Sequence, residues 1–438
     1  MPRQAYRAAI FHLLGDPPRG EYAADGVLVV EDGHVVQAGA WSDLGPRLKD
    51  IPVTHYPGAL IVPGFVDAHV HYPQLDVIAS PASHLLDWLS NHTYPSEARF
   101  ADRAVADEAA GFFLDELLRH GTTTALVYPT VHKASVEALF EAARTRNMRL
   151  ATGKVLMDRG APDNLRDTAD LSDSSDLIRA WHGKGRLIYA ITPRFAATSS
   201  AAQLEGAGRL LAENPGVLLH THLSENHEEI ALVKSLFPDC ADYLGVYEKF
   251  GLVTDRSVFA HCLHLSDGEW QRLARAKSAI AFCPTSNLFL GSGLFDMARA
   301  RLHGIPVGLA TDVGGGTSLS LLQTMNEAFK VGQLRRHMLD AYALFHLATL
   351  GGAKALGMDD RIGNLEPGKE ADFLVLDLGA TPLLKRRTAA ARTPEEILFA
   401  LAMLGDDRAV AHTYIAGARA FSRDAASTTA AARHTTPP

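Results

Sequence analysis

Two histidines, His69 and His71, stand two positions apart at the end of an apolar run at residues 60–66. Because side chains of a β-strand alternate between its two faces, both imidazoles point to the same side at the C-terminal end of that strand. Neutral imidazoles held together on a rigid strand form half of a site for a divalent transition metal. The pair therefore predicts a metal centre, provided that further ligands follow downstream.

Later apolar runs end in side chains of the right kind. His222 lies in the run at 217–223, and His261 and Asp312 lie at the ends of two further runs. Three imidazoles and one carboxylate can surround one divalent ion and leave a position for water, whose pKa falls towards 7. A carboxylate at such a site can take the proton of the water, and another can deliver it to a substrate.

The elements that must position these side chains alternate along the chain. Eight apolar runs predict strands at 59–66, 123–128, 149–156, 187–192, 217–223, 257–262, 279–283 and 306–312. Helix-like segments lie between them, as at 135–146, 201–213, 225–236 and 267–276. This alternation predicts an α/β fold, a (β/α)8 TIM-like barrel over residues 59–360, with its functional groups at the C-terminal ends of the strands.

Both ends of the chain have the pattern of β structure. Asp32-Gly33 between two apolar runs predicts a hairpin within residues 1–58, and similar runs recur within 361–421. We expect the two flanks to pair into one small β-sandwich domain formed by both chain termini. Residues 422–438, rich in Ala, Thr, Arg and Pro, are expected to be a disordered tail.

The composition narrows the partners and the compartment. The chain has 438 residues, a net charge of −8 and no Lys/Arg cluster, so we expect no nucleic-acid partner. No run approaches the roughly 18 apolar residues of a membrane span, so no membrane partner is expected. Three cysteines without CxxC spacing, at 240, 262 and 283, are typical of a reducing compartment, and we expect the protein to be cytoplasmic.

The combined pattern resembles the amidohydrolase superfamily. The resemblance rests on the segment 63–71, where Pro-Gly-Phe-Val-Asp precedes the His-x-His pair, and on His222, His261 and Asp312. The segment 363–372 is also similar to the entry into the β-sandwich domain of that superfamily. The resemblance supports the barrel and the terminal β domain that the strand pattern predicts.

The resemblance also implies a ligand set and an assembly. One Zn2+ per subunit would be bound by His69, His71, His222 and Asp312. Fe2+ accepts the same ligands, so the identity of the metal stays open. His261 would lie just outside the metal ligands and polarise the attacking water or the substrate. A homodimer is implied as well.

Finer motifs are similar to the mononuclear deaminases of that superfamily. The segment His222-Leu223-Ser224-Glu225 resembles their His-x-x-Glu motif, in which the glutamate carries a proton to a ring nitrogen. No lysine closes the strand at 187–192, so the bridging lysine of binuclear members is missing. A set of further segments resembles the members that deaminate guanine: 71–74, 85–89, 93–95, 154–159 and 192–195.

The side chains of these segments suit a purine base. Arg194 presents two donors that match the O6 and N7 acceptors of guanine. Gln74 can donate and accept at one edge of the ring, and Phe195 or Trp88 can stack on its face. By the resemblance, Gln74, Arg194 and Phe195 hold the base.

The implied reaction is the hydrolytic deamination of guanine to xanthine and ammonia. Metal-activated hydroxide attacks C2, Glu225 protonates N3, and Asp312 accepts the proton of the water and relays it to the departing amine. Two alternatives stay open. One is a related mononuclear enzyme acting on another aminated or chlorinated heterocycle, such as a pterin, cytosine or a triazine, and the other is a non-catalytic scaffold of the same superfamily.

Individual residues also have structural alternatives. His220 competes with His222 for the ligand role, but only His222 is followed by a glutamate three positions later, so we expect His220 to be packed or hydrogen-bonded inside the barrel. His261 could be a core histidine and Asp312 a helix cap. Arg194 could pair with a structural carboxylate instead of a substrate.

Overall fold

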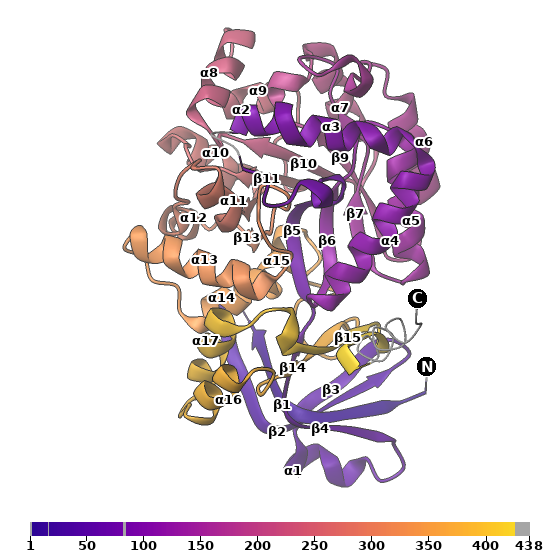
Figure 1. Cartoon of the computed structure of the whole chain (residues 1–438), viewed down its shortest axis with the longest axis vertical. Helices are drawn as coiled ribbons and strands as arrows, with labels where there is room; N and C mark the ends of the chain where they lie inside the picture. The colour runs from indigo at the N-terminus through magenta and orange to yellow at the C-terminus, as the bar shows by residue number, and fades with distance from the viewer. Residues whose placement is uncertain (1, 16, 82–84, 425–438) are drawn as a thin grey trace, which may run out of the picture.

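The computed structural model describes residues 2–15, 17–81 and 85–424 of the chain. It is a mixed α/β fold in which a barrel surrounded by helices lies beside a separate β-sheet (Figure 1). Of the expected tail at 422–438, residues 425–438 lie outside the described part. Within the described part, no helix combines the length and the apolar character needed to cross a membrane.

Eight parallel strands form the barrel, and their order in space follows their order in the chain. The N–H of Asp312 donates to the carbonyl of His69 (2.9 Å) and that of His71 to the carbonyl of Val313 (2.8 Å), which joins the last strand to the first. The predicted barrel is therefore confirmed. Its strands are β5 (Phe65–His71), β6 (Thr122–Tyr128), β7 (Arg149–Thr152), β9 (Leu187–Pro193), β10 (Leu218–Leu223), β11 (Ser257–His261), β12 (Ala279–Phe282) and β13 (Val307–Leu309), and the short β8 (Val155–Leu156) pairs with β9.

Helices cover the outside of the barrel, so its strands are buried on both faces; all seven residues of β5 are buried. Ser200 and Ser266 accept main-chain N–H bonds as N-caps, which explains why α7 and α10 begin where the sequence predicts. The helices are α4 (Arg103–Arg119), α5 (Lys133–Thr145), α6 (Ser172–Trp181), α7 (Ala201–Glu213), α8 (His227–Leu236), α9 (Tyr243–Lys249), α10 (Asp267–Ala276), α11 (Pro284–Phe289), α12 (Met297–Leu302), α13 (Leu321–Leu334), α14 (Ala341–Ala348) and α15 (Leu350–Ala355).

The two ends of the chain pair into a single seven-stranded sheet, in the order β16-β15-β14-β4-β1-β2-β3. Asp32 and Gly33 both have positive φ and join β2 to β3 as the predicted hairpin. The strands are β1 (Gln4–Leu14), β2 (Arg19–Glu31), β3 (His34–Ala40), β4 (Val53–Pro63), β14 (Phe373–Asp377), β15 (Val410–Ile415) and β16 (Ala418–Ser422).

The predicted strand at 59–66 is divided between the two sheets. Residues 59–63 belong to β4, which pairs with β1 and β14, whereas the barrel strand begins only at Phe65. Gly64 lies at the break, where an added Cβ would come within 2.1 Å of Thr123 Oγ1. The apolar run does not reveal the break because both strands are buried, and Leu60 and Val62 of β4 even share a core cluster with Phe65 of β5. His69 and His71 consequently lie inside β5 rather than after its end.

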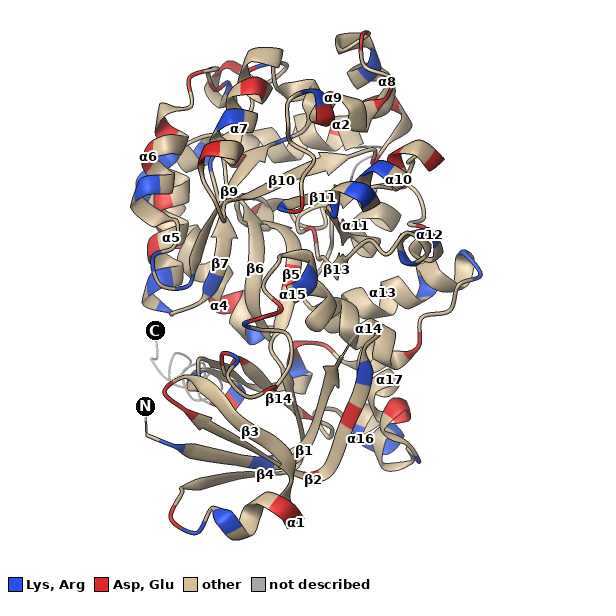
Figure 2. Ribbon diagram, turned by 180° about the vertical axis from the view of Figure 1, so that it is seen from behind, with Lys and Arg blue, Asp and Glu red and all other residues tan. Residues whose placement is uncertain are grey.

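The C-terminal flank also contains helices that the sequence pattern did not predict. α16 (Pro382–Ala389) and α17 (Pro394–Leu404) lie between β14 and β15, and α17 packs against α13 and α14. Shorter helices are α1 (Trp41–Leu44), α2 (Leu85–Trp88), α3 (Tyr94–Ala98), η1 (Gly45–Arg47), η2 (Tyr72–Val77), η3 (Leu89–Thr93), η4 (Arg99–Ala101), η5 (Asp163–Leu165), η6 (Ala196–Thr198) and η7 (Asp407–Ala409). Charged residues of both signs are interspersed on the outer helices (Figure 2).

Candidate metal and substrate site

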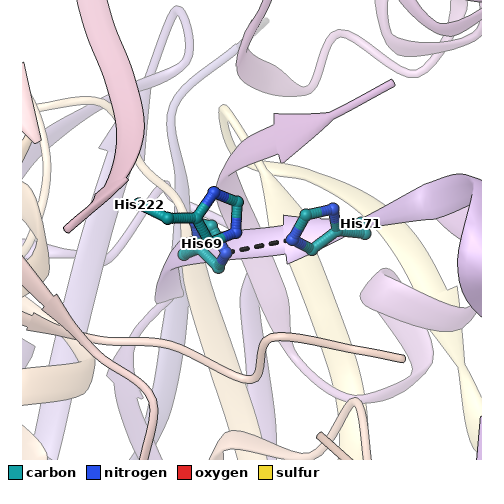
Figure 3. Close-up of side chains that lie close together, drawn as sticks. All are labelled: His69, His71 and His222. Carbon is teal, nitrogen blue, oxygen red and sulfur yellow. Dashed lines mark hydrogen bonds between the residues drawn. The ribbon is translucent and has the colours of Figure 1, made fainter. Parts of the chain in front are cut away.

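Five predicted side chains converge at the C-terminal mouth of the barrel. His69 and His71 come from β5, His222 from β10, and His261 is the last residue of β11, whereas Asp312 follows β13. Figure 3 shows the imidazoles of His69, His71 and His222 gathered at one place. Residues that are 243 positions apart in the chain are thus brought together because parallel strands end at one rim.

The donor atoms lie close enough to share one cation. His71 Nε2 is 3.0 Å from His69 Nε2, and Asp312 Oδ1 is 3.1 Å from His69 Nε2 and 3.3 Å from His71 Nε2. Potential ligand atoms of His69, His71 and His222 all lie within 4.8 Å of one another, as do those of His69, His261 and Asp312. Three imidazole nitrogens and a carboxylate match the donors that a divalent ion such as zinc prefers. The residues present therefore fit a metal ion.

The main chain is bent sharply where these strands end. Ser224, His261 and Asp312 have φ values of 51°, 69° and 49°, in the left-handed region that residues with a Cβ rarely adopt. Asp67 supports this arrangement, since it accepts hydrogen bonds from the N–H of His69 (3.2 Å) and the N–H of Thr311 (3.1 Å). Strained backbone of this kind persists at functional sites when neighbouring contacts fix it.

Burial favours the neutral form of three of these histidines. It lowers the pKa of His71 to about 4 and that of His261 to about 3, and it holds the pKa of His222 well below the usual value. Burial alone would raise the pKa of Asp312, but the imidazoles of His69 and His71 hold it well below its ordinary range. Neutral imidazoles beside an ionised carboxylate are the protonation states that a metal ion requires.

His261 is oriented by a residue that the sequence analysis missed. The side-chain amide of Asn287, on α11, donates to His261 Nδ1 (2.8 Å), so the ring carries its proton on Nε2. His261 Nε2 lies 3.4 Å from Glu225 Oε2 and 3.8 Å from Asp312 Oδ2. The proton of His261 is thus directed between two carboxylates at the mouth of the barrel.

Glu225 is placed to hold a proton. Its side chain is buried, and Ser292 Oγ donates a hydrogen bond to Oε1 (3.0 Å). Burial, together with the negative charges of Asp312 and Glu229, raises the pKa of Glu225 well above its usual value. A carboxylic acid that is protonated near neutral pH can donate its proton to a weakly basic atom of a substrate.

A cavity of about 450 Å³ opens above these groups. Its wall combines apolar and polar side chains, as is usual for sites that bind small ligands. All four residues predicted to bind a substrate line it, and so do most of the predicted metal and catalytic residues: Gln74, Trp88, Arg194 and Phe195, with His71, His222, Glu225, His261 and Asp312. His69 is fully buried and does not belong to the lining.

Two of the wall residues share a partner. Gln74 Nε2 donates to Glu97 Oε1 (3.0 Å), and Arg194 forms an ion pair with Glu97 Oε2 (2.6 Å). The guanidinium of Arg194 also lies over the ring of Tyr94, 5.4 Å from its centroid. Arg194 thus has the structural carboxylate that was considered as an alternative, and it lines the cavity at the same time.

His220 has the interior place that the sequence predicts for it. Its Nε2 lies 2.6 Å from His69 Nδ1, on the side of the His69 ring away from His71. A metal-binding histidine commonly donates its second ring N–H to a buried acceptor, which fixes its tautomer. The contact is consistent with His222, rather than His220, as the ligand from β10.

Sequence reasoning missed Glu97, Asn287 and Ser292. A signal existed for Asn287, because the polar segment 284–287 directly follows a barrel strand and functional groups gather at such ends. Glu97 lies in the long excursion between β5 and β6, where no periodic pattern marks it. Only the folded chain reveals its contacts with Gln74 and Arg194.

Comparison with known proteins identifies the class to which this fold and site belong. Residues 60–419 match the amidohydrolase family, and the chain belongs to that family. It is similar to the guanine deaminase of Escherichia coli (strain K12), with 52% identity over 406 residues that cover 92% of each chain.

Solved structures give the same picture. The structure of E. coli guanine deaminase superposes with a TM-score of 0.94 at 49% identity, over 96% of this chain and 100% of that one. The guanine deaminase of C. acetobutylicum, solved with guanine bound in its active site, has a TM-score of 0.88 at 29% identity, over 96% of this chain and 100% of that one. The similarity to these relatives extends over nearly the whole of the chain.

Proposed function

We propose that this chain is a guanine deaminase, a hydrolase that cleaves a C–N bond of a cyclic amidine. Guanine and water are converted to xanthine and ammonia. The observation that carries the proposal is the cavity in which the His/Asp cluster, the buried Glu225 and the polar pair Gln74 and Arg194 face one small volume. The similarity to guanine deaminases over nearly the whole chain supports the choice of substrate.

His69, His71, His222 and Asp312 are the residues that would hold one divalent ion, with Zn2+ as the proposed metal and Fe2+ as the alternative. The ion supplies Lewis acidity that lowers the pKa of the attacking water towards neutrality. Asp312 Oδ2, which lies 3.8 Å from His261 Nε2, is the oxygen that would accept the proton of this water.

Glu225 and His261 have the remaining two roles, proton donation and stabilisation of negative charge. Glu225, whose pKa is raised by burial and by neighbouring carboxylates, would donate a proton to N3 of the base as the oxygen of water adds to C2. His261 Nε2–H stabilises the negative charge that develops on that oxygen. Transfer of the proton held by Asp312 to the amino group allows ammonia to leave. The remaining proton of the added water passes to Glu225 as the C2 oxygen becomes a carbonyl, so Asp312 is again a carboxylate and Glu225 again holds a proton.

The cavity wall would hold the base by its edges and faces. Arg194 donates to the O6 and N7 side of guanine, and Gln74 supplies an amide that both donates and accepts. Phe195 and Trp88 line the cavity with aromatic rings that can cover the face of the purine. These contacts select a flat, polar bicyclic ligand.

The proposal extends to the setting in which the enzyme works. We place it in purine catabolism in the cytoplasm, with a small-molecule purine as its partner rather than nucleic acid or a membrane. We also propose a homodimer, because Leu302, Leu334 and Met338 are 80%, 65% and 65% exposed around the contact of Arg301 with His337. Light scattering tests the dimer, whose expected mass is twice the 47.2 kDa of one chain.

The central test compares substrates. Purified protein loaded with zinc should form xanthine from guanine and act much more slowly on a pterin, cytosine and an aminotriazine. Absence of guanine turnover would refute the proposal, and preferred turnover of another heterocycle would replace it. Metal analysis of the same sample separates an enzyme from a scaffold, since a metal-free and inert protein would indicate a scaffold.

A further inference from the structure

Glu97 is a buried carboxylate just behind the cavity wall. It lies on α3, is 1% exposed and does not line the cavity. Its two oxygens serve two different wall residues, since Oε1 accepts from Gln74 and Oε2 accepts from Arg194. Both of these residues do line the cavity, so a single carboxylate behind the wall connects the two polar groups that face the ligand.

The contacts fix the orientation of the Gln74 amide. Gln74 Oε1 accepts the N–H of Gly314 (3.1 Å), while Nε2 donates to Glu97. A flipped amide would place its NH2 against the N–H of Gly314 and its oxygen against the carboxylate, so both contacts would become repulsive. Gln74 therefore presents one fixed arrangement of its second N–H and its oxygen to a ligand.

Glu97 also balances the charge of Arg194. The guanidinium is 2% exposed, and its ion pair with Glu97 is 2.6 Å long. A buried guanidinium without this partner would attract an anion into the cavity, because an unpaired charge in a low-dielectric site is costly. With Glu97 ionised, the pair carries no net charge, and Arg194 offers its other N–H groups as directional donors only.

We propose that Glu97 is a positioning residue that restricts the pocket to a neutral purine. It acts through Gln74, whose amide it orients, and through Arg194, whose charge it neutralises. The inference rests on the proposed function, because it names how that same site distinguishes its neutral substrate from anionic purines. The same preference favours release of the product. Xanthine loses a ring proton more readily than guanine does, and the pocket disfavours the resulting anion.

The first test is the variant Glu97→Gln. Glutamine has one acceptor oxygen in place of two, so either Gln74 or Arg194 loses its partner. We expect KM for guanine to rise by at least about tenfold, which corresponds to the loss of one charged hydrogen bond, with a smaller fall in kcat. An unchanged KM would overturn the proposal.

The second test measures the binding of xanthine by calorimetry at two pH values, one below and one above the pKa at which xanthine loses a ring proton and becomes an anion. Wild-type protein should bind xanthine more weakly at the higher pH because the pocket disfavours the anion. The Glu97→Gln variant retains an unpaired guanidinium, and its affinity should instead rise with pH. Parallel pH trends in the two proteins would overturn the role of charge neutralisation.

Two further variants separate charge from geometry. Glu97→Asp keeps the charge but withdraws the carboxylate, so KM should rise while the pH trend of xanthine binding stays that of wild type. Glu97→Asp also serves as the test if Glu97→Gln does not fold. An unchanged KM for guanine in Glu97→Asp would contradict the proposal. Asp167→Asn is the matched control, because it breaks a buried ion pair with Lys154 (2.6 Å) away from the cavity lining. It should lower stability without changing the pH trend.

The outcomes distinguish this inference from the proposed function. If wild-type protein does not deaminate guanine, the proposed function fails, whatever the variants do. If wild-type protein is active and Glu97→Gln matches it in KM and in the pH trend of xanthine binding, only the inference fails. Because calorimetry does not depend on turnover, the second comparison remains available in either case.

Discussion

The two ends of the barrel use buried charge in opposite ways. At the N-terminal end, Arg149 and Arg186 precede or begin their strands and form ion pairs with Glu370, and Arg186 also pairs with Asp372. These pairs join the barrel to the terminal sheet, because Glu370 and Asp372 directly precede β14. At the C-terminal end, Arg194 and Glu97 form one such pair behind the cavity wall, but the imidazoles of the candidate metal site lie against Asp312 and Glu225 instead of against arginines.

The difference is visible in single atoms. Glu370 accepts from Arg149 Nε (2.9 Å) and from Arg186 Nε (3.0 Å), so its charge is fully compensated. At the mouth, His261 Nε2 and His71 Nδ1 have no hydrogen-bond partner among the described residues. Paired charges at one end stabilise the fold, whereas unpaired polar groups at the other end can bind and react. Substitutions at the two ends should therefore have different consequences.

Removal of the metal should have the largest effect, and it should be confined to the mouth. Treatment with a strong chelator is expected to abolish nearly all xanthine formation, because the ligand cluster no longer activates water. Addition of Zn2+ should restore it. Metal content by mass spectrometry and activity are measured on the same samples. Full activity in metal-free protein would contradict the assignment of a catalytic metal site to the C-terminal mouth.

The substitution Glu225→Gln should have the next largest effect on activity. The amide keeps the shape of the side chain but carries no proton to the base, so we expect kcat to fall by about 10²- to 10⁴-fold. Stability should stay the same or increase, because a buried carboxyl group beside other acids is lost. Glu228→Gln, at an exposed position in the first turn of α8, three residues after Glu225, is the control. Near-normal turnover in Glu225→Gln would exclude it as the proton donor.

Glu370→Ala is the counterpart at the other end of the barrel. It leaves Arg149 buried without its partner, and the loss should be about 3–5 kcal/mol of unfolding free energy. KM and kcat should remain those of wild type, since no cavity residue touches Glu370. Urea unfolding measures the first quantity and xanthine formation the second. Asp176→Ala, which removes surface pairs with Arg179 and Lys133, should cost no more than about 1 kcal/mol.

The two ends also differ in how far the sequence predicts them. The mouth was predictable because buried parallel strands appear as continuous apolar runs, and chemistry collects where such runs end. His222, His261 and Asp312 could be proposed from that rule alone. Glu97 could not, because it lies outside any strand end and its importance arises only from contacts with residues 23 and 97 positions away.

The ion pairs at the N-terminal end of the barrel could not be predicted from the sequence, for a similar reason. Arg149 and Glu370 are 221 positions apart, and nothing in either local segment indicates that they meet. The break at Gly64 was missed because hydrophobicity reports burial, not which sheet a strand joins. Local patterns predict elements and their exposed ends, whereas pairs between distant elements depend on the assembled topology.

The smallest expected effect is the loss of the stability contributed by Glu370 when the pH is lowered. Burial works to raise the pKa of Glu370, but the hydrogen bond from Arg149 and the charge of Arg186 outweigh it and lower the pKa from its usual 4.5. A carboxylate whose pKa is lower in the folded than in the unfolded chain stabilises the fold above the unfolded-state value. That stabilisation is lost as the pH falls through the folded-state pKa.

Wild-type protein should therefore lose part of its stability below about pH 4.5, where unfolded chains take up the proton more readily than folded ones. Glu370→Gln has no carboxyl group at this position, so the stability difference between it and wild type should shrink as the pH falls from 7 to 3. Groups at the C-terminal mouth titrate equally in both proteins. The difference in unfolding free energy therefore reports only on the ion pairs of Glu370 at the N-terminal end of the barrel. A difference that stays constant over this range would mean that the charge of Glu370 does not hold the two sheets together.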